Sequence, residues 1–382
     1  METLNLDQLR NQLDEIDQQI LQLFRRRMET VQAVAAYKKA KGLPVFQGQR
    51  EREILNRAAE QAGPELEDAA RILYATLLDL SRSSQNRILT APGPLSEKIR
   101  KAMAETPNLF PKHSLVACQG VEGAYSQQAC DKFFPAANIL YFRNFEGVFQ
   151  AVEQGLCPYG VLPIENSTHG TVDEVYDLMQ RYACYIVRSI KLKIDHVLLT
   201  PPDVSLEDVR EVFSHEQAIG QCSEFLKAHP NIKVTVCENT AAAAKMVAAS
   251  GRKDCASISS RCCASLYGLH AAAENIQNSD GNYTRFLCIS RKLEIYPGAN
   301  RISLMMALPH KPGALYAVIA KFSALGVNLT KLESRPVPGS DFEFRFYFDM
   351  EASVCSPSVL SLLDELAAGA EQFVFLGSYS EG

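Results

Sequence analysis

The chain has 382 residues, of which 47% are hydrophobic and 22% charged, values typical of globular chains and not of disordered or collagen-like ones. At roughly 150 residues per domain, this length predicts two or three domains. Thirty-nine Lys and Arg against 44 Asp and Glu give a net charge of −5, which provides no general attraction for nucleic acid or an anionic membrane. Any anionic ligand must therefore be held by local cations.

The first residues, 1–7, lack the positive charge and the apolar stretch of a signal peptide, and no apolar run reaches the 18 residues that a membrane span requires. The eleven cysteines are an odd number without a C-x-x-C pattern, which predicts neither a disulfide framework nor a zinc site. We therefore expect a cytoplasmic protein with reduced thiols and no bound metal.

The first ninety residues carry helical periodicity. Apolar side chains recur at steps of three and four from Leu6 through Ile16 to Leu23, which predicts one long helix to about Ala40. At ~1.5 Å per residue it would be about 50 Å long, more than two short helices of the same chain can cover. We therefore expect a homodimer that shares these helices, and further helices at about 49–62 and 65–89.

Arg27 and Lys38 continue the apolar seam of this first helix. They are eleven residues apart, about 20° in phase, so both can point into one pocket. Arg10 lies about 100° from Arg27 and is better placed to serve a neighbouring subunit. Ser81 and Gln85 lie one turn apart on the third expected helix. Standing alone, the two seam cations could equally be edge residues whose stems lie along the surface.

Together with the 50–53 charge run, these residues resemble the all-helical chorismate mutases over essentially the whole segment. In that family cations hold a dicarboxylate in its compact conformer, and donors face the oxygen that gains charge. The resemblance implies that Lys38 and Gln85 are catalytic donors and that Arg10 comes from the partner protomer. At 47 the chain has Gln where the family commonly has an acid, and we leave it out. The implied substrate-binding residues are Arg10, Arg27, Lys38, Arg50, Glu51, Ser81 and Gln85.

Four polar clusters follow apolar strand signals in the middle of the chain, at 119–126, 163–170, 213–221 and 282–286. Clusters at the carboxyl ends of strands are the usual ligand site of an α/β sheet, and a cleft between two lobes suits about 180 residues. Neither G-x-G-x-x-G nor a Walker lysine is present, so a nucleotide site is not favoured. Any single Ser, Thr or Asn in these clusters could instead cap a helix.

The motifs within these clusters resemble prephenate dehydratase: Gly120-x-x-Gly123-x-Tyr125-Ser126, Pro163-Ile164-Glu165-Asn166-Ser167, Ser214-His215-x-Gln217 and Thr284-Arg285-Phe286. The resemblance implies loss of carbon dioxide and of the ring hydroxyl from prephenate, with Thr284 as the catalytic donor of a proton to the departing hydroxyl. It implies no metal and no organic cofactor. The residues expected to bind this substrate are Ser126, Asn166, Ser214, Gln221, Glu238 and Arg285.

The last eighty residues predict strands and helices in the order βαββαβ, a ferredoxin-like arrangement. Two motifs, Pro312-Gly313-Ala314-Leu315 and Leu332-Glu333-Ser334-Arg335-Pro336, resemble the regulatory ACT module of prephenate dehydratases. The resemblance implies a phenylalanine effector, held at a subunit interface, and feedback inhibition. The effector-binding residues would be Gly313, Ala314, Leu315, Glu333, Ser334 and Arg335.

The sequence thus predicts a multidomain chain: an all-α helical mutase domain at 1–91, a linker at 92–112, a two-lobed α/β dehydratase domain with a cleft at 113–292, and an α+β ferredoxin-like ACT domain at 300–382. The predicted function is a bifunctional enzyme of phenylalanine biosynthesis that converts chorismate to prephenate and prephenate to phenylpyruvate. Its partners would be these small molecules, a second copy of the chain or a higher homo-oligomer, and no nucleic acid. Two alternatives remain: a dehydratase whose helical arm only dimerises, and an amino-acid-binding regulator without the chemistry.

Overall fold

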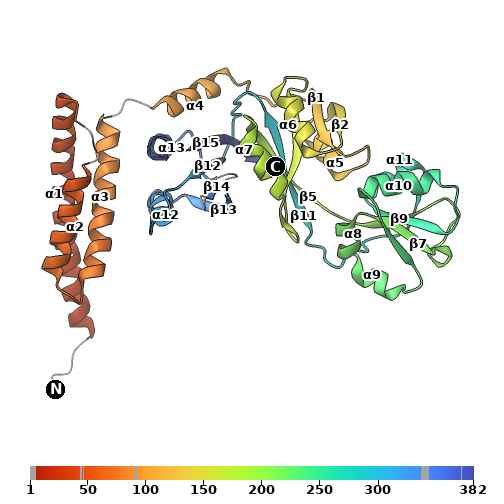
Figure 1. The fold of residues 1–382 in the computed structure, drawn as a ribbon, viewed down its shortest axis with the longest axis horizontal. Coiled ribbons are helices and arrows are strands. Elements are labelled where there is room, and N and C mark those ends of the chain that lie inside the picture. Colours follow the sequence, from red (N-terminus) through yellow and green to blue (C-terminus); the bar gives the residue numbers. More distant parts are fainter. Residues whose placement is uncertain (1–5, 44, 46, 90–92, 337–343, 371) are drawn as a thin grey trace. The chain divides into compact units, whose positions relative to one another are not determined.

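The computed structural model describes residues 6–43, 45, 47–89, 93–336, 344–370 and 372–382. The chain divides into two compact units, Met1–Glu97 with Leu360–Gly369 and Lys98–Val359 with Ala370–Gly382. Figure 1 shows their helices and strands. Among the described residues, no helix has the length and apolar character needed to cross a membrane.

Three helices make up most of the first unit, and their bounds lie within two residues of the predicted ones. They are α1 Leu6–Lys41, α2 Gly48–Ala62 and α3 Glu67–Leu89. The helix α3 contacts both α1 and α2 (Figure 1). The apolar seam of α1 stays open to solvent, since Leu13 is 60% exposed and Leu23 is 65% exposed. No segment among the described residues therefore covers this face.

The residues expected as a linker contain a fourth helix, α4 Pro94–Glu105. A proline suits the first position of a helix because its missing N–H would have no partner there in any case. The carboxylate of Asp364 accepts hydrogen bonds from the backbone N–H groups of Gly93 at 2.9 Å and Ser96 at 3.0 Å. These bonds satisfy donors that the first turn of a helix leaves free.

The second unit is built on two sheets. The larger has ten strands in the order β13-β14-β12-β15-β5-β11-β3-β1-β2, with β4 beside β3, and the smaller has the order β10-β6-β9-β7-β8. The strands of the larger sheet are β1 His113–Gln119, β2 Ala136–Phe142, β3 Tyr159–Asn166, β4 Gly170–Thr171, β5 Tyr185–Lys193, β11 Tyr283–Ser290, β12 Arg301–Ala307, β13 Asn328–Pro336, β14 Phe344–Glu351 and β15 Phe373–Glu381. Those of the smaller are β6 Val197–Thr200, β7 Glu211–Ser214, β8 Lys233–Val236, β9 Cys255–Ser259 and β10 His270–Ala273.

Helices connect these strands, as expected for an α/β chain with two lobes. They are α5 Tyr125–Phe133, α6 Phe145–Glu153, α7 Asp173–Arg181, η1 Leu206–Asp208, α8 Glu216–Gln221, α9 Ser223–Ala228, α10 Thr240–Ala249, α11 Cys262–Tyr267, α12 Ala314–Ala324 and α13 Pro357–Gly369. The C-terminal elements follow the order β12-α12-β13-β14-α13-β15.

The C-terminal strands pair with the rest of the larger sheet next to a glycine that permits a close backbone approach. Strand β15 pairs in parallel with β5 through Ser380 and Glu381. Just before this pairing, Gly377 has φ +149°, and a Cβ at this position would lie 2.2 Å from the carbonyl oxygen of Ile186. Only glycine permits this approach, because any side chain would collide with the backbone of β5.

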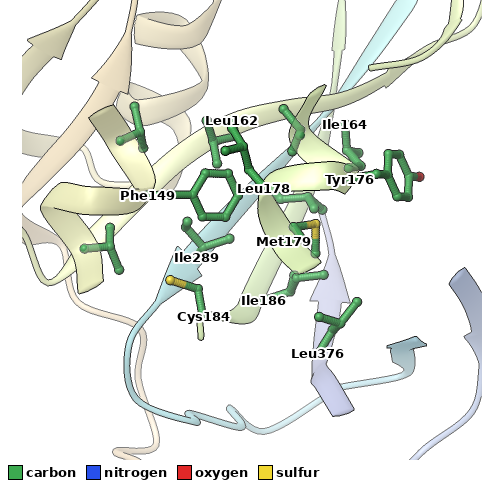
Figure 2. Close-up of a cluster of buried hydrophobic side chains, with 14 of the residues drawn as sticks. Phe149, Leu162, Ile164, Tyr176, Leu178, Met179, Cys184, Ile186, Ile289 and Leu376 are labelled. Atoms are coloured by element: carbon green, nitrogen blue, oxygen red, sulfur yellow. The ribbon is translucent and has the colours of Figure 1, made fainter. Parts of the chain in front are cut away.

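The hydrophobic core beneath this junction draws on both segments. Figure 2 shows Phe149 of α6, Leu162 of β3 and Met179 of α7 in one buried cluster with Leu376 of β15. Fully burying side chains of this size contributes roughly 1.5–3 kcal/mol each. The C-terminal strands thus share a hydrophobic core with β3, α6 and α7.

Residues 163–166, which the sequence places in a loop, form the end of β3 instead. Proline lacks the N–H that a ladder needs, so it is tolerated in strands mainly at edges and bulges. Here the register with β11 shifts beside Pro163, and the pairing of β3 with β1 stops at Val161. The missing N–H is therefore not required, and the strand extends to Asn166.

Candidate functional sites

Arg27 links the first helix to the third. Its Nη1 donates to the carbonyl of Leu77 at 3.1 Å and to the hydroxyl of Ser81, both on α3. The structure therefore brings together the seam cation and the serine that the sequence assigned to one site.

Lys38 lies three turns further along the same helix and is only 8% exposed. Its Nζ donates to the carbonyl of Val45 at 2.7 Å. Burial lowers the pKa of Lys38, and the nearby Glu51 carboxylate partly opposes this effect. Gln85 on α3 is also 8% exposed, and its Oε1 has no hydrogen-bond partner among the described residues. Two buried groups that can donate hydrogen bonds thus lie in the helical unit.

The remaining predicted mutase residues have other neighbours. The carboxylate of Glu51 pairs with Arg82, a residue that sequence reasoning missed. Arg50 is exposed and pairs with Glu53 at 3.3 Å. Arg10 is exposed on α1, 28 positions before Lys38, which on one helix is about 42 Å. Within one chain Arg10 therefore cannot reach Lys38.

Thr284, at the start of β11, stands opposite Asn166 at the end of β3. The Nδ2 of Asn166 donates to Thr284 Oγ1 at 2.9 Å and to Asn282 Oδ1 at 2.8 Å. Its Oδ1 accepts from the hydroxyl of Thr168 at 2.6 Å, which fixes the amide orientation. The oxygen of Thr284 accepts the hydrogen bond from Asn166, and no described residue accepts the proton of its hydroxyl.

A cavity of about 310 Å³ opens beside these residues, at the junction of the two sheets. Of the predicted residues, Gln221 lines it, and Asn166 contacts its lining residue Thr168. The full lining is polar, and it includes neighbours of the predicted motifs that the sequence did not assign to the site. These lining residues are Thr168, His169, Gly220, Gln221, Gln277, Asn278, Ser279 and Asn282.

Besides Thr284, Asn166 and Arg285, three further predicted residues do not line this cavity. Ser214 is fully buried and donates to the carbonyl of Ile258 at 2.6 Å. Ser126 is buried in the first turn of α5, and Glu238 is exposed between β8 and α10. For Ser214, the hydrogen bond inside the small sheet accounts for the residue.

Arg285, predicted to meet a substrate carboxylate, is held by carboxylates of the protein itself. It is 5% exposed, with its Nε 2.7 Å from Glu165 and its Nη2 paired with the buried Asp349 on β14. Burial alone would lower the pKa of Arg285, but the carboxylate of Asp349 and its other neighbours raise it. Lys331 on β13 reaches the second oxygen of Glu165 at 3.0 Å. Residues next to Thr284 and Asn166 therefore bind directly to the C-terminal strands.

The two C-terminal motifs lie in different surroundings. Ala314 and Leu315 line a cavity of about 450 Å³, and Gly313, at φ +79°, precedes α12 at its edge. Glu333 and Arg335 instead contact β4 and α7. Glu333 accepts from Thr171, whereas Arg335 pairs with Asp173 and Asp177 of α7, and Ser334 is exposed. The remaining residues that line the cavity are Leu308, Pro309, His310, Lys311, Pro312, Phe344 and Phe346.

Comparisons with known proteins match both parts of the chain. A family model described as prephenate dehydratase matches residues 116–294, and one described as chorismate mutase type II matches residues 9–86. The bifunctional chorismate mutase/prephenate dehydratase of Escherichia coli K12 is 30% identical over 97% of this chain and 95% of its own length. The chloroplastic arogenate dehydratase/prephenate dehydratase 2 of Arabidopsis thaliana is 38% identical over 69% of this chain and 72% of its own. Among solved structures, the prephenate dehydratase of Arthrobacter aurescens in complex with L-Phe is similar with a TM-score of 0.64 and 28% identity, over 70% of this chain and 89% of that one.

Proposed function

The chain belongs to the bifunctional chorismate mutase/prephenate dehydratase family, and from that premise we propose which of its residues carry the two reactions of phenylalanine biosynthesis. The helical unit converts chorismate to prephenate. The two-lobed α/β part converts prephenate to phenylpyruvate. The observation that carries the second assignment is the hydrogen bond from Asn166 to Thr284 beside a polar cavity.

In the mutase reaction, the protein orients the substrate and stabilises the charge that develops on its ether oxygen. Lys38 and Gln85 are the donors to that oxygen, which would replace the carbonyl of Val45 as the acceptor of the lysine proton. Arg27 and Arg50 bind the carboxylates. Because Arg10 is too far along its own helix, the partner subunit's Arg10 completes the site.

In the dehydratase reaction, prephenate dianion and one proton give phenylpyruvate, carbon dioxide and water. The C–O bond to the ring hydroxyl breaks as Thr284 gives that oxygen its proton, and the electrons of the departing carboxylate complete the aromatic ring. A threonine is a weak acid, so its role depends on orientation. The amide of Asn166 supplies that orientation by occupying the acceptor side of the threonine oxygen.

Separate assays of chorismate consumption and phenylpyruvate formation test these assignments. We expect Thr284→Ala to abolish phenylpyruvate formation from prephenate and to leave mutase turnover unchanged, whereas Thr284→Ser keeps a hydroxyl and retains part of the activity. Equal loss of both activities in Thr284→Ala would mean misfolding. A wild-type protein that consumes no chorismate would leave only a dimerising role for the helices.

We further propose the domain scheme of 1–91, 92–112, 113–292 and 300–382, in a homodimer formed through α1. The exposed apolar seam from Leu6 to Leu23 supports a second copy of this chain as its partner, because such a face on a surface helix marks an interaction site. Eleven free cysteines fit a reducing compartment such as the cytoplasm.

The C-terminal ACT domain binds phenylalanine and thereby inhibits the dehydratase. The cavity beside Gly313 supports this proposal, because a helix N-terminus can receive the effector carboxylate while Leu315, Phe344 and Phe346 surround its ring. The related Arthrobacter aurescens structure is titled as a complex with L-Phe. Calorimetry should show phenylalanine binding that a substrate analogue weakens, by the reciprocity of coupled sites. Binding that is unaffected by the analogue would contradict the regulatory role.

A further inference from the structure

His196 is a buried histidine that has no part in the mechanism proposed above. It is 2% exposed and immediately precedes β6 of the smaller sheet. Its backbone N–H donates to Gln277 Oε1 at 3.0 Å, and its carbonyl accepts from the N–H of Ile276 at 3.2 Å. Burial lowers the pKa of His196, which keeps the ring neutral at neutral pH. His196 is therefore an uncharged side chain held at a fixed place next to the cavity, which Gln277 lines.

The tautomer of His196 follows from the surroundings of its two ring nitrogens. Nε2 lies 2.6 Å from Gln221 Oε1, whereas the buried Nδ1 has no hydrogen-bond partner among the described residues. A proton on Nδ1 would be a buried donor without an acceptor, which is costly, while a proton on Nε2 is donated to Gln221. His196 therefore donates through Nε2, and Gln221 Oε1 is its acceptor.

The other end of the Gln221 amide reaches the loop that follows β3. With Oε1 bound to His196, Nε2 lies 3.1 Å from His169 Nδ1 and 3.4 Å from Thr168 Oγ1. Both of these atoms accept, because Nδ1 carries no proton in the neutral ring that this contact requires, and the hydroxyl proton of Thr168 is directed to Asn166 Oδ1 at 2.6 Å. A turned amide would point its oxygen at two acceptors. The orientation of Gln221 therefore decides whether α8 is hydrogen-bonded to the loop.

The same loop holds the amide that faces Thr284. The backbone N–H groups of Thr168 and His169 each donate to Asn166 Oδ1 at 3.0 Å. Because a backbone N–H can only donate, these bonds identify the amide oxygen and leave Asn166 Nδ2 to donate to Thr284 Oγ1 at 2.9 Å. A shift of the loop therefore moves Asn166 and, with it, the hydrogen-bond partner of the threonine proposed as proton donor.

We propose that His196 is a positioning residue of the dehydratase reaction: it fixes the Gln221 amide and, through this amide, the loop that holds Asn166. The proposal rests on the dehydratase function proposed above. His196 does not line the cavity, so it acts on Thr284 only through this chain of hydrogen bonds. The chain runs from the residue before β6 in the smaller sheet to the start of β11 in the larger sheet, and it connects the two lobes beside the cavity.

Removing the donor at position 196 leaves the side chains that line the cavity unchanged but frees the Gln221 amide to turn over. In the turned orientation, its oxygen faces the two acceptors of the loop, so the hydrogen bonds between α8 and the loop are lost. Thr284 must deliver its proton to the departing hydroxyl in one geometry, and a displacement of about 1 Å can cost about a hundredfold in rate. The loss should therefore appear mainly in kcat.

The test compares two amide substitutions of His196 in the full-length protein, with prephenate as the substrate. The amide of His196→Gln can reach the position of Nε2 and donate to Gln221, whereas the shorter amide of His196→Asn reaches only the position of Nδ1. We expect His196→Asn to lower kcat by about 10–100-fold and to raise KM by a smaller factor, and His196→Gln to recover kcat to within about threefold of wild type. Equal losses of kcat in the two variants, or a change confined to KM, would overturn the proposal.

Thr168→Val tests the same chain at an exposed residue, where a folding defect is not expected. It removes the hydroxyl that contacts both Gln221 and Asn166, and it should lower kcat about two- to tenfold, the effect of one lost hydrogen bond, whereas Thr168→Ser keeps the hydroxyl. In the double variant His196→Asn/Thr168→Val, the two losses should combine to less than their product, because both break one chain. An unchanged kcat in Thr168→Val, or losses that multiply in full, would count equally against the proposal.

The matched control is His229→Asn, the same substitution at the end of α9. The Nδ1 of His229 lies 2.8 Å from the carbonyl oxygen of Phe225, and the residue lies outside both the chain and the cavity lining, so neither kcat nor KM should change. Thermal unfolding reports folding in every variant, and a purely structural role of His196 would lower the Tm and kcat together in both of its variants. If wild-type protein forms no phenylpyruvate, the proposed dehydratase function itself fails, and no variant is needed to see it.

Discussion

Replacing Asp349 by asparagine removes one charge from a buried ion pair. Asp349 is 1% exposed, and its carboxylate receives the Arg285 guanidinium on one oxygen and the hydroxyl of Ser303 on the other. Asparagine keeps the shape and one acceptor, so Arg285 is left with Glu165 as its only carboxylate partner in the cluster. Breaking one side of a buried pair typically costs 3–5 kcal/mol, and the retained acceptor places this variant near the lower value, about 3 kcal/mol.

Thermal unfolding of the variant gives the measurement. At roughly 2–4 °C per kcal/mol for units of this size, the Tm of the unit that contains Thr284 should fall by about 6–12 °C. Dehydratase turnover should fall at least tenfold, because Arg285 adjoins Thr284 in β11, while mutase turnover in the other unit serves as the internal control.

The double variant Arg285→Met/Asp349→Leu separates charge from packing. It removes both charges, and Lys331 remains to neutralise Glu165 at 3.0 Å, so its stability loss should be smaller than the sum of the single losses. Its dehydratase activity should nevertheless stay low. A Tm change below about 2 °C in Asp349→Asn, or strict additivity in the double variant, would refute the assignment of a buried, coupled pair.

Three further outcomes are expected. Lys38→Ala should lower mutase turnover by about 10²–10³ with the dehydratase intact, and exposed Lys41→Ala should not. Because burial lowers the pKa of Lys38, wild-type mutase activity should decline with rising pH earlier than the ordinary lysine value of 10.5 would give, and a decline only above that pH would contradict the assignment. Hydrogen bonds from Cys263 and Ser260 lower the pKa of Cys262, so its alkylation should reach half its maximum at a lower pH than that of an ordinary thiol. Burial raises the pKa of Cys222, which should lag, and equal labelling of both thiols by mass spectrometry would be inconsistent with this.

The helical part of the fold could be predicted almost residue by residue, because a seam at steps of three and four is a local property of the chain. The predicted first helix ended near Ala40, and α1 ends at Lys41. Leu13 and Leu23 belong to the same seam, although the single chain leaves them exposed. The homodimer proposed above would cover them. Arg82 was missed because its pairing with Glu51 is a contact between two helices, which the apolar periodicity of either helix does not reveal.

The geometry of the candidate dehydratase site was predicted only in part. Three predicted residues lie close together as expected: Asn166, Gln221 and Thr284. The end of β3 pairs with the start of β11 in the larger sheet, and Gln221 lies in α8, which follows β7 of the smaller sheet. The place of Arg285 could not be predicted, since its partner Asp349 lies 64 residues away in the segment assigned to regulation. Likewise, Pro163 indicated a loop because local rules do not reveal a bulge in a pairing with a distant strand.

Strand β14 connects the two proposed activities of the second unit. Phe346 lines the cavity proposed for phenylalanine, and Asp349 lies three residues further along the same strand, about 10 Å at the usual rise. An effector that shifts β14 therefore acts on Arg285 and, through it, on Thr284. By linkage, a substrate that fixes Thr284 must oppose the effector equally. We expect Asp349→Asn to retain phenylalanine binding in calorimetry but to lose its mutual weakening with a substrate analogue, and full mutual weakening in this variant would place the coupling in other contacts, such as those of Lys331 with Glu165.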